Sequence, residues 1–130
     1  MAGSFSDYLE DKLLKHVFTN TAYTSPTSLY VALYTVAPSD TGGGTEVSGG
    51  SYVRKVATFT VSGTSTLATN SAAIEYDAAT ASWGTIVAIA IYDASTAGNF
   101  LAFADLTTSK TIDTGDILRI PSGDLDITLS

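Results

Sequence analysis

Residues 29–36 read LYVALYTV, an almost wholly apolar run of aromatic and β-branched side chains that stops shortly before Pro38. Such a run, apolar on both faces, is typical of a strand with a layer packed against each face. Residues 85–93, TIVAIAIYD, have the same character. We therefore expect two central strands, and we interpret the rest of the chain as what surrounds them.

The segment YVRKVATFTVS (52–62) alternates between apolar and polar residues, which predicts a strand with one buried face. The residues expected on that face are Val53, Ala57, Phe59 and Val61. Shorter strands are predicted at AAIEY (72–76), FLAFADL (100–106), ILRIP (117–121) and DLDITLS (124–130). In the last of these we expect Leu125, Ile127 and Leu129 to point inward.

The strand candidates number about seven or eight and are spaced as in an antiparallel sandwich. We therefore predict a mainly β fold, an antiparallel β-sandwich of jelly-roll or immunoglobulin-like type. A length of 130 residues suits one domain, and no linker or internal repeat divides it. We expect a single domain over residues 1–130, with the β body beginning at about residue 28.

A different period precedes this β body, because apolar residues recur every four positions. They are Phe5, Leu9, Leu13 and Val17. This spacing is helical, and acidic residues early in the segment and basic residues late in it complement the helix dipole. We predict an amphipathic helix over residues 6–18, whose apolar stripe has to be covered by the domain's own sheet or by a neighbouring subunit.

The segment SDTGGGTEVSGGS (39–51) contains five glycines and few side chains able to pack. We expect a long exposed loop between strands, and loops of this length are often functional. Residues 77–84, DAATASWG, are interpreted as a turn region.

Charge and composition exclude several functions. Thirteen acidic residues against six basic ones give a net charge of −7, which is unsuited to binding a nucleic-acid backbone. No cysteine is present, so disulfides and thiolate chemistry are excluded. The longest uncharged apolar stretch, 78–92, is shorter than a membrane helix needs and contains Gly84, and the acidic N-terminus does not resemble a secretory leader.

The sequence offers no convincing catalytic, metal or cofactor site. His16 is the only histidine and lies at the end of the predicted helix, so we interpret it as a surface residue. Asp124 and Asp126 share one strand face, where a solvated face is a better explanation than calcium binding or glycoside hydrolysis. The glycine-rich loops lack the lysine of a phosphate-binding loop.

Aromatic and basic residues are the remaining candidates for binding. Six tyrosines and Trp83 could form a platform for a sugar or a partner, namely Tyr23, Tyr30, Tyr34, Tyr52, Tyr76 and Tyr92. Tyr30 and Tyr34 share one face of a central strand, so core packing is the better interpretation for that pair. Arg54 and Lys55 form the only basic pair of the predicted β body, suited either to a partner contact or to a charged strand edge.

The chain resembles a family of small virion proteins of tailed bacteriophages, catalogued as tail fibre or head-decoration proteins. The segments that carry the resemblance are FSDYLEDKLLKHVFTNTAYTSP (5–26), LYVALYTVAPSDTGGGTEVSGGSYVR (29–54), TASWGT (80–85), IYDASTAGNFLAFADLTTSKTI (91–112) and GDLDITL (123–129). Residues 56–72 depart from the family pattern. The resemblance implies a non-enzymatic part of a virus particle, assembled in the host cytoplasm, and supplies no catalytic residue.

Three hypotheses follow. The first is a capsid cement or decoration protein that binds and stabilises the lattice of the major capsid protein, as a homo-oligomer and without contacting nucleic acid or membrane. The alternative is a tail-associated adaptor or a fibre or receptor-binding module, with the 39–51 loop and Trp83 facing outward. A small glycosidase using Asp124 and Asp126 is disfavoured. The residues predicted to bind partners are Phe5, Leu9, Leu13, Val17, Arg54 and Trp83.

Overall fold

The computed structural model describes residues 3–63 and 66–128. Within them the chain forms one helix and eleven strands, and every strand pair is antiparallel. The mainly β prediction is confirmed. In chain order the elements are β1 (Gly3–Phe5), α1 (Asp7–Phe18), β2 (Leu29–Val36), β3 (Thr45–Glu46), β4 (Lys55–Ala57), β5 (Phe59–Val61), β6 (Leu67–Asn70), β7 (Ile74–Glu75), β8 (Gly84–Tyr92), β9 (Phe100–Ile112), β10 (Arg119–Ile120) and β11 (Asp126–Thr128).

The main sheet has the strand order β1-β9-β8-β2-β3, with β4 also paired to β2. The two predicted central strands, β2 and β8, are neighbours in it, and Leu33 stands opposite Ile89. Apolar side chains are buried on both faces of these strands, which explains why neither strand alternates. One face carries Val31, Leu33 and Ile89, and the other carries small residues beside Tyr34.

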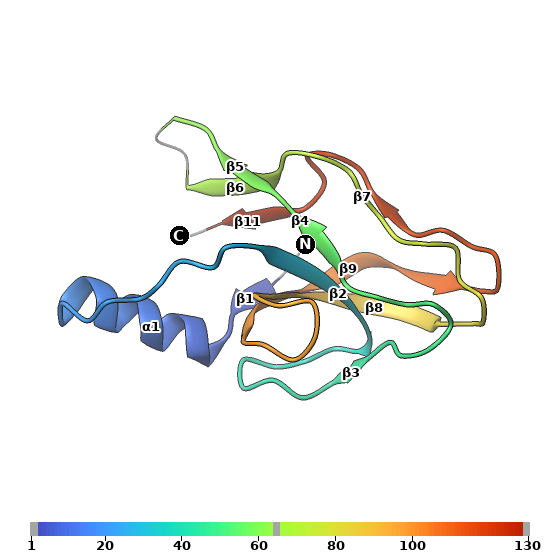
Figure 1. Cartoon of the computed structure of the whole chain (residues 1–130), viewed down its shortest axis with the longest axis horizontal. Coiled ribbons are helices and arrows are strands. Elements are labelled where there is room, and N and C mark those ends of the chain that lie inside the picture. The colour runs from blue at the N-terminus through green and yellow to red at the C-terminus, as the bar shows by residue number, and fades with distance from the viewer. Residues whose placement is uncertain (1–2, 64–65, 129–130) are drawn as a thin grey trace.

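A second layer covers one face of the main sheet and gives a sandwich-like arrangement (Figure 1). It consists of a three-stranded sheet, β11-β6-β5, and the pair β10-β7. Ile74, Tyr76, Leu118 and Leu125 from this layer join Leu33 of the main sheet in one hydrophobic core. Leu125 therefore points inward as predicted, whereas Leu129 lies outside the described residues.

The predicted strand 52–62 is in fact two strands in two layers. β4 pairs with β2 of the main sheet, and β5 pairs with β6 of the second layer. The chain thus crosses between layers at Thr58, and one inward face cannot continue through the crossing. Ala57 is buried and Phe59 packs against the core, but Val53 and Val61 are exposed, so their expected burial was wrong.

β9 is longer than predicted and continues through the polar residues 107–111 to Ile112. Its register against β8 shifts between Ile86 and Ala88, so that residues 106–109 stand opposite Val87 alone. This bulge, together with the polar residues that surround it, removes the alternation by which the second half of the strand could have been predicted.

Helix α1 confirms the helical prediction. The Ser6 side chain accepts a hydrogen bond from the Leu9 backbone N–H at 3.2 Å and so caps the helix N-terminus. Ser6 also anchors the helix to the body, because its hydroxyl and its N–H donate to the carbonyls of Phe100 and Leu101 at 2.6 and 2.8 Å. From this anchor the helix extends to one side of the two layers (Figure 1), and none of its residues is buried.

Most of the 39–51 segment is exposed, as predicted, but its second half is attached to the body. It contains β3, and Val47 within it is part of the core. Gly50 has a positive φ of 59° and lies so close to Trp83 that a Cβ would stand 2.7 Å from the indole nitrogen. This loop is therefore fastened to the body at its second half. No helix in the described part of the chain is long and apolar enough to cross a membrane.

Candidate functional site

A groove of about 530 Å³ lies where α1 leaves the body. Its walls come from α1, from β1, β8 and β9 of the main sheet, and from β11 of the second layer. β1 and β11 are each the last strand of their sheet, so the groove follows an open edge of the sandwich. The apolar residues that shape it include Phe5, Leu13, Leu14, Ile89, Phe103 and Ile127.

The structure brings part of the predicted binding stripe to this groove. Phe5, at the end of β1, and Leu13 on α1 line it. Leu9, which lies between them in the sequence, is half-buried. Val17 lies farther along α1 and is 64% exposed. It shares that uncovered end of the helix with Leu14 at 59% and Phe18 at 78% exposure. The groove and the uncovered stripe thus form one continuous apolar surface.

The charged residues that line the groove are both acidic: Glu10 on α1 and Asp126 on β11. Sequence reasoning missed the β11 wall. The alternation of residues 124–129 indicated that Leu125 and Ile127 point inward, but it carries no signal that β11 ends its sheet beside the helix. It is the position of β11 that makes Asp126 a lining residue of the groove.

A second groove of similar volume, about 530 Å³, lies between the second half of β9 and β10. Its lining carries charges of both signs, with Lys110 and Arg119 beside Asp124. Mixed charges do not specify one kind of partner, and no exposed helix adjoins this groove. The groove beside α1 is therefore the better candidate for an interaction site.

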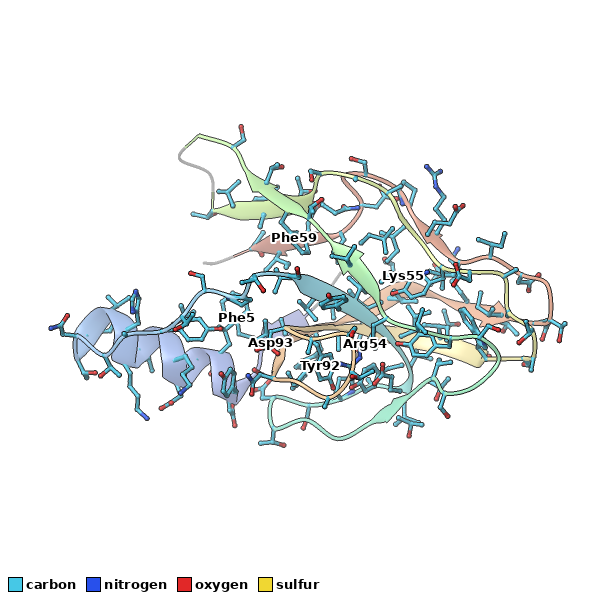
Figure 2. All side chains as sticks on the ribbon, viewed as in Figure 1. Phe5, Arg54, Lys55, Phe59, Tyr92 and Asp93 are labelled. Carbon is cyan, nitrogen blue, oxygen red and sulfur yellow. The ribbon has the colours of Figure 1, made fainter. Side chains whose placement is uncertain are left out.

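Arg54 lies at the centre of a network that joins three segments of the chain. Its Nε and Nη2 donate to both carboxylate oxygens of Glu46 at 2.9 and 2.8 Å, and its Nη1 donates to the carbonyls of Ala94 and Ala97. The guanidinium carbon stands 3.7 Å from the centroid of the Tyr92 ring. Both residues are labelled in Figure 2. We call this arrangement the Arg54 clasp. It holds the 39–51 segment and the 93–99 turn together.

The clasp changes the acidity of its members. Burial alone would raise the pKa of Glu46, but the hydrogen bonds from Arg54 and Tyr52 and the charge of Arg54 outweigh it, so that pKa lies below its ordinary value. The same carboxylate raises the pKa of Arg54 above its ordinary value, chiefly by accepting its hydrogen bonds. Both groups are therefore charged at neutral pH and pair with each other. The structure places Arg54 in an internal contact, and its predicted contact with a partner stays a prediction.

Trp83 is buried, so the outward orientation given to it in the hypothesis of a tail-associated module was wrong. Its indole N–H donates to the Gly50 carbonyl at 2.9 Å, and its ring packs edge-on against Tyr52 and Tyr76. Burial raises the pKa of the Tyr76 hydroxyl, which donates to the Val31 carbonyl at 2.7 Å. This aromatic cluster fills the core rather than forming a binding platform.

The other tyrosines are dispersed. Tyr34 is buried on the opposite face of the main sheet, where its hydroxyl shares a short hydrogen bond with that of Tyr92. Burial raises the pKa of Tyr34, and this hydrogen bond raises it further. Tyr30 is half-buried on β2, and Tyr23 is half-buried in the segment that follows α1. Core packing is thus the correct interpretation for Tyr34.

The residues considered for catalysis are dispersed as well. His16 is exposed near the end of α1, with its Nδ1 3.2 Å from the Thr21 carbonyl oxygen. Asp124 and Asp126 are both exposed. Over residues 3–63 and 66–128, no group of three or more histidine, aspartate or glutamate side chains could hold a metal ion.

Comparison with known proteins gives one assignment. Residues 4–128 match the family model described as podophage GP4 fiber I protein gp80. No curated protein matches the chain. The match includes α1, every residue that lines the groove and the Arg54 clasp, so it concerns the whole domain rather than one motif. The chain belongs to the podophage fibre I protein family, a family of phage fibre proteins.

Proposed function

We propose that this chain is a non-enzymatic structural component of a podophage tail fibre assembly, and that α1 with the adjoining groove is its assembly surface. The observation that carries the proposal is the coincidence of two uncovered apolar features. The helix stripe ends in Leu14, Val17 and Phe18, and it runs directly into a groove lined by Leu13 and Leu14. An isolated domain gains nothing from exposing such a surface to water, whereas an assembled subunit buries it.

Attachment to another virion protein fits the remaining features. The body has a continuous core that does not depend on α1, because the helix contributes no buried residue. An arm of this kind can be covered by a partner without rearrangement of the domain. The acidic net charge of −7 also keeps the domain away from the packaged genome.

Capsid decoration is the second candidate. The observation that favours it is the shape of the domain: a single sandwich-like body without the repeats or heptads of an extended fibre shaft. In that case the major capsid protein would cover α1. The description of the matched family as a fibre protein supports the tail position instead.

Electron cryo-microscopy of purified particles distinguishes these positions. We expect density for this domain at the tail, in a copy number set by the tail's rotational symmetry, with α1 against a neighbouring protein. Density distributed over the capsid lattice would support decoration of the shell. Absence of the protein from mature particles would refute both.

A matched pair of variants tests the assembly surface. Phe18→Ser removes the most exposed apolar side chain of α1, and Val36→Ser removes an exposed side chain from the last residue of β2, which does not line the groove. We expect Phe18→Ser to reduce incorporation into particles and Val36→Ser to leave it unchanged, as measured by quantitative mass spectrometry of purified virions. Equal incorporation of the two variants would contradict the proposal.

A further inference from the structure

We infer that the groove beside α1 binds an extended segment of a different virion protein, which adds a strand to the open edge of β11 and carries basic side chains alternating with apolar ones. The inference rests on the proposed function, because it states the chemistry of the partner that the assembly surface receives. It is carried by the backbone groups on that edge, by the apolar lining of the groove and by the sign of its charges.

β11 has an open edge at the groove. Its described residues pair with β6, and β11 is the last strand of that sheet, on the side of α1 and β1 (Figure 1). The Leu125 carbonyl accepts a hydrogen bond from the Asn70 N–H at 3.1 Å, so the backbone groups of residues 125 and 127 point toward β6. Because these directions alternate along a strand, the N–H and C=O groups of Asp126 and Thr128 point to the open edge. Both residues line the groove.

Such an edge selects an extended occupant. Backbone groups on a sheet edge are paired when another strand is added, and this is the basis of peptide recognition by strand addition. A helix in the groove would leave them unpaired, because its own N–H and C=O groups pair within the helix. An added strand would continue the order β5-β6-β11 into the space between β11 and α1.

The main sheet offers an apolar surface to one face of that strand. Ile89 and Ile91 of β8 and Ala102 of β9 line the groove, and Ile91 stands opposite Ala102 in the sheet. Side chains of an extended segment point alternately to opposite faces, so every second residue of the segment would rest on this surface. Those positions favour apolar residues, and Leu13 of α1 adds a further apolar contact.

The intervening positions of the segment favour basic residues. The charged residues that line the groove, Glu10 and Asp126, are both acidic and both exposed. A partner without cations would take these carboxylates out of water unpaired, at a cost in free energy. Lysine or arginine at the outward positions removes this cost. The segment therefore has a pattern of alternating apolar and basic residues.

This chain does not supply such a segment from its own sequence. Each of its six cations lies in an element or pair already described: Lys12 and Lys15 in α1, Arg54 in the clasp, Lys55 in β4, Lys110 in β9 and Arg119 in β10. The link between α1 and β2, residues 19–28, contains no basic residue. A second copy would have to unfold part of its own structure to donate the strand, and this favours another protein as the partner.

A synthetic peptide tests the contact on the full chain. The probe is a short peptide of alternating valine and lysine, and the control peptide has glutamate in place of each lysine. In an NMR titration we expect the lysine peptide to bind and to protect the amides of Asp126 and Thr128 from exchange, with no added protection at Ile127, which already faces β6. Absence of binding at millimolar peptide, equal binding of the two peptides, or equal protection at all three amides would overturn the inference.

A matched pair of variants tests the role of charge. Asp126→Asn should weaken binding of the lysine peptide by about threefold or more, and the difference should diminish at high salt. Asp124→Asn removes the same charge two residues away, from an exposed side chain that does not line this groove, and should leave binding unchanged. Equal effects of the two substitutions would contradict the pairing with Asp126.

Photo-cross-linking in purified virions tests the natural partner. Benzoylphenylalanine is introduced at position 128, in the groove, or at position 36, outside it, as the control. We expect position 128 to cross-link to a segment of alternating apolar and basic residues in a different virion protein, and position 36 not to reach that segment. A cross-link from position 128 to a second copy of this chain or to an acidic segment, or no cross-link, would overturn the inference and leave the proposed function standing. Absence of the chain from virions would refute the proposed function itself.

Discussion

Replacing Arg54 by methionine is the most informative single perturbation of this fold. The Arg54 side chain is 9% exposed and its partner Glu46 is 25% exposed, so the ion pair is largely shielded from water. Arg54→Met keeps the aliphatic length of the side chain but removes every hydrogen bond of the clasp and the charge above the Tyr92 ring. It leaves the Glu46 carboxylate with Tyr52 as its remaining donor.

The expected cost follows from these contacts. Removing one partner of a buried ion pair destabilises a protein by about 3–5 kcal/mol. The lower end applies here, because Glu46 is partly exposed and keeps the bond from Tyr52 at 2.8 Å. Losing the cation–π contact adds about 0.5–2 kcal/mol. We therefore expect the free energy of unfolding to fall by about 3.5–5 kcal/mol.

Lys55→Met is the matched control. Lys55 is the next residue, carries the same charge and is also paired, with Asp77 at 3.1 Å, but Asp77 is 63% exposed. An exposed pair of this kind contributes less than about 1 kcal/mol.

Urea unfolding followed by the fluorescence of Trp83, the only tryptophan, measures both variants. We expect the midpoint for Arg54→Met to fall by about 1–2 M and the midpoint for Lys55→Met to change by much less. Equal shifts for the two variants would refute the reasoning. In Arg54→Met, a loss of hydrogen-exchange protection confined to the 39–51 and 93–99 segments would show that Arg54 stabilises these two segments.

Three further predictions concern the same framework. The pKa of Glu46 is lower in the folded state than in the unfolded state. The contribution of this carboxylate to stability is therefore complete above the ordinary glutamate pKa and is lost as the pH falls through the lowered value. Unfolding measured against pH should show this loss, and the Glu46→Gln variant should not show it. Asn70 is buried, and its side chain makes four hydrogen bonds, two of them with backbone N–H groups just before β11. Asn70→Ala should therefore lower the free energy of unfolding by at least about 3 kcal/mol and increase amide exchange in β11. Gly49 and Gly50 both have a positive φ, but only a Cβ at position 50 would meet Trp83. In thermal unfolding, Gly50→Ala should therefore destabilise the fold by at least about 1 kcal/mol more than Gly49→Ala. Equal effects of the two substitutions would count against this close approach.

The sequence predicted those elements whose pattern is local. Residues 29–36 and 85–93 are apolar on both faces because both strands lie inside the main sheet, and the four-residue spacing from Phe5 to Val17 reflects a real helix. The division of 52–62 was missed because alternation continues through Thr58 while the chain passes to another layer. A pattern of neighbours along the chain does not record such a crossing.

The candidate site was predicted to the same limited extent. The apolar face of α1 is visible in the sequence, and so is the need to cover it. The second wall of the groove depends on β11 ending its sheet beside the helix, which is a tertiary arrangement. The Arg54 clasp also escaped prediction, because opposite charges at positions 46 and 54 lie on separate segments, and only folding brings them within 2.8 Å. Trp83 seemed able to face outward because its burial depends on the approach of a distant glycine.

The attachment of α1 through Ser6 decides how the domain would bear mechanical load. A pull on the helix is transmitted along the chain to β1 and β2, and through the Ser6 hydrogen bonds with Phe100 and Leu101 to the start of β9. β9 is the longest strand, and its pairing with β8 extends from Phe100 to Ile112. Tension applied to α1 is thereby shared among the many hydrogen bonds between the strands of the main sheet. The small three-stranded sheet, β11-β6-β5, is not directly connected to the helix and lies outside this path.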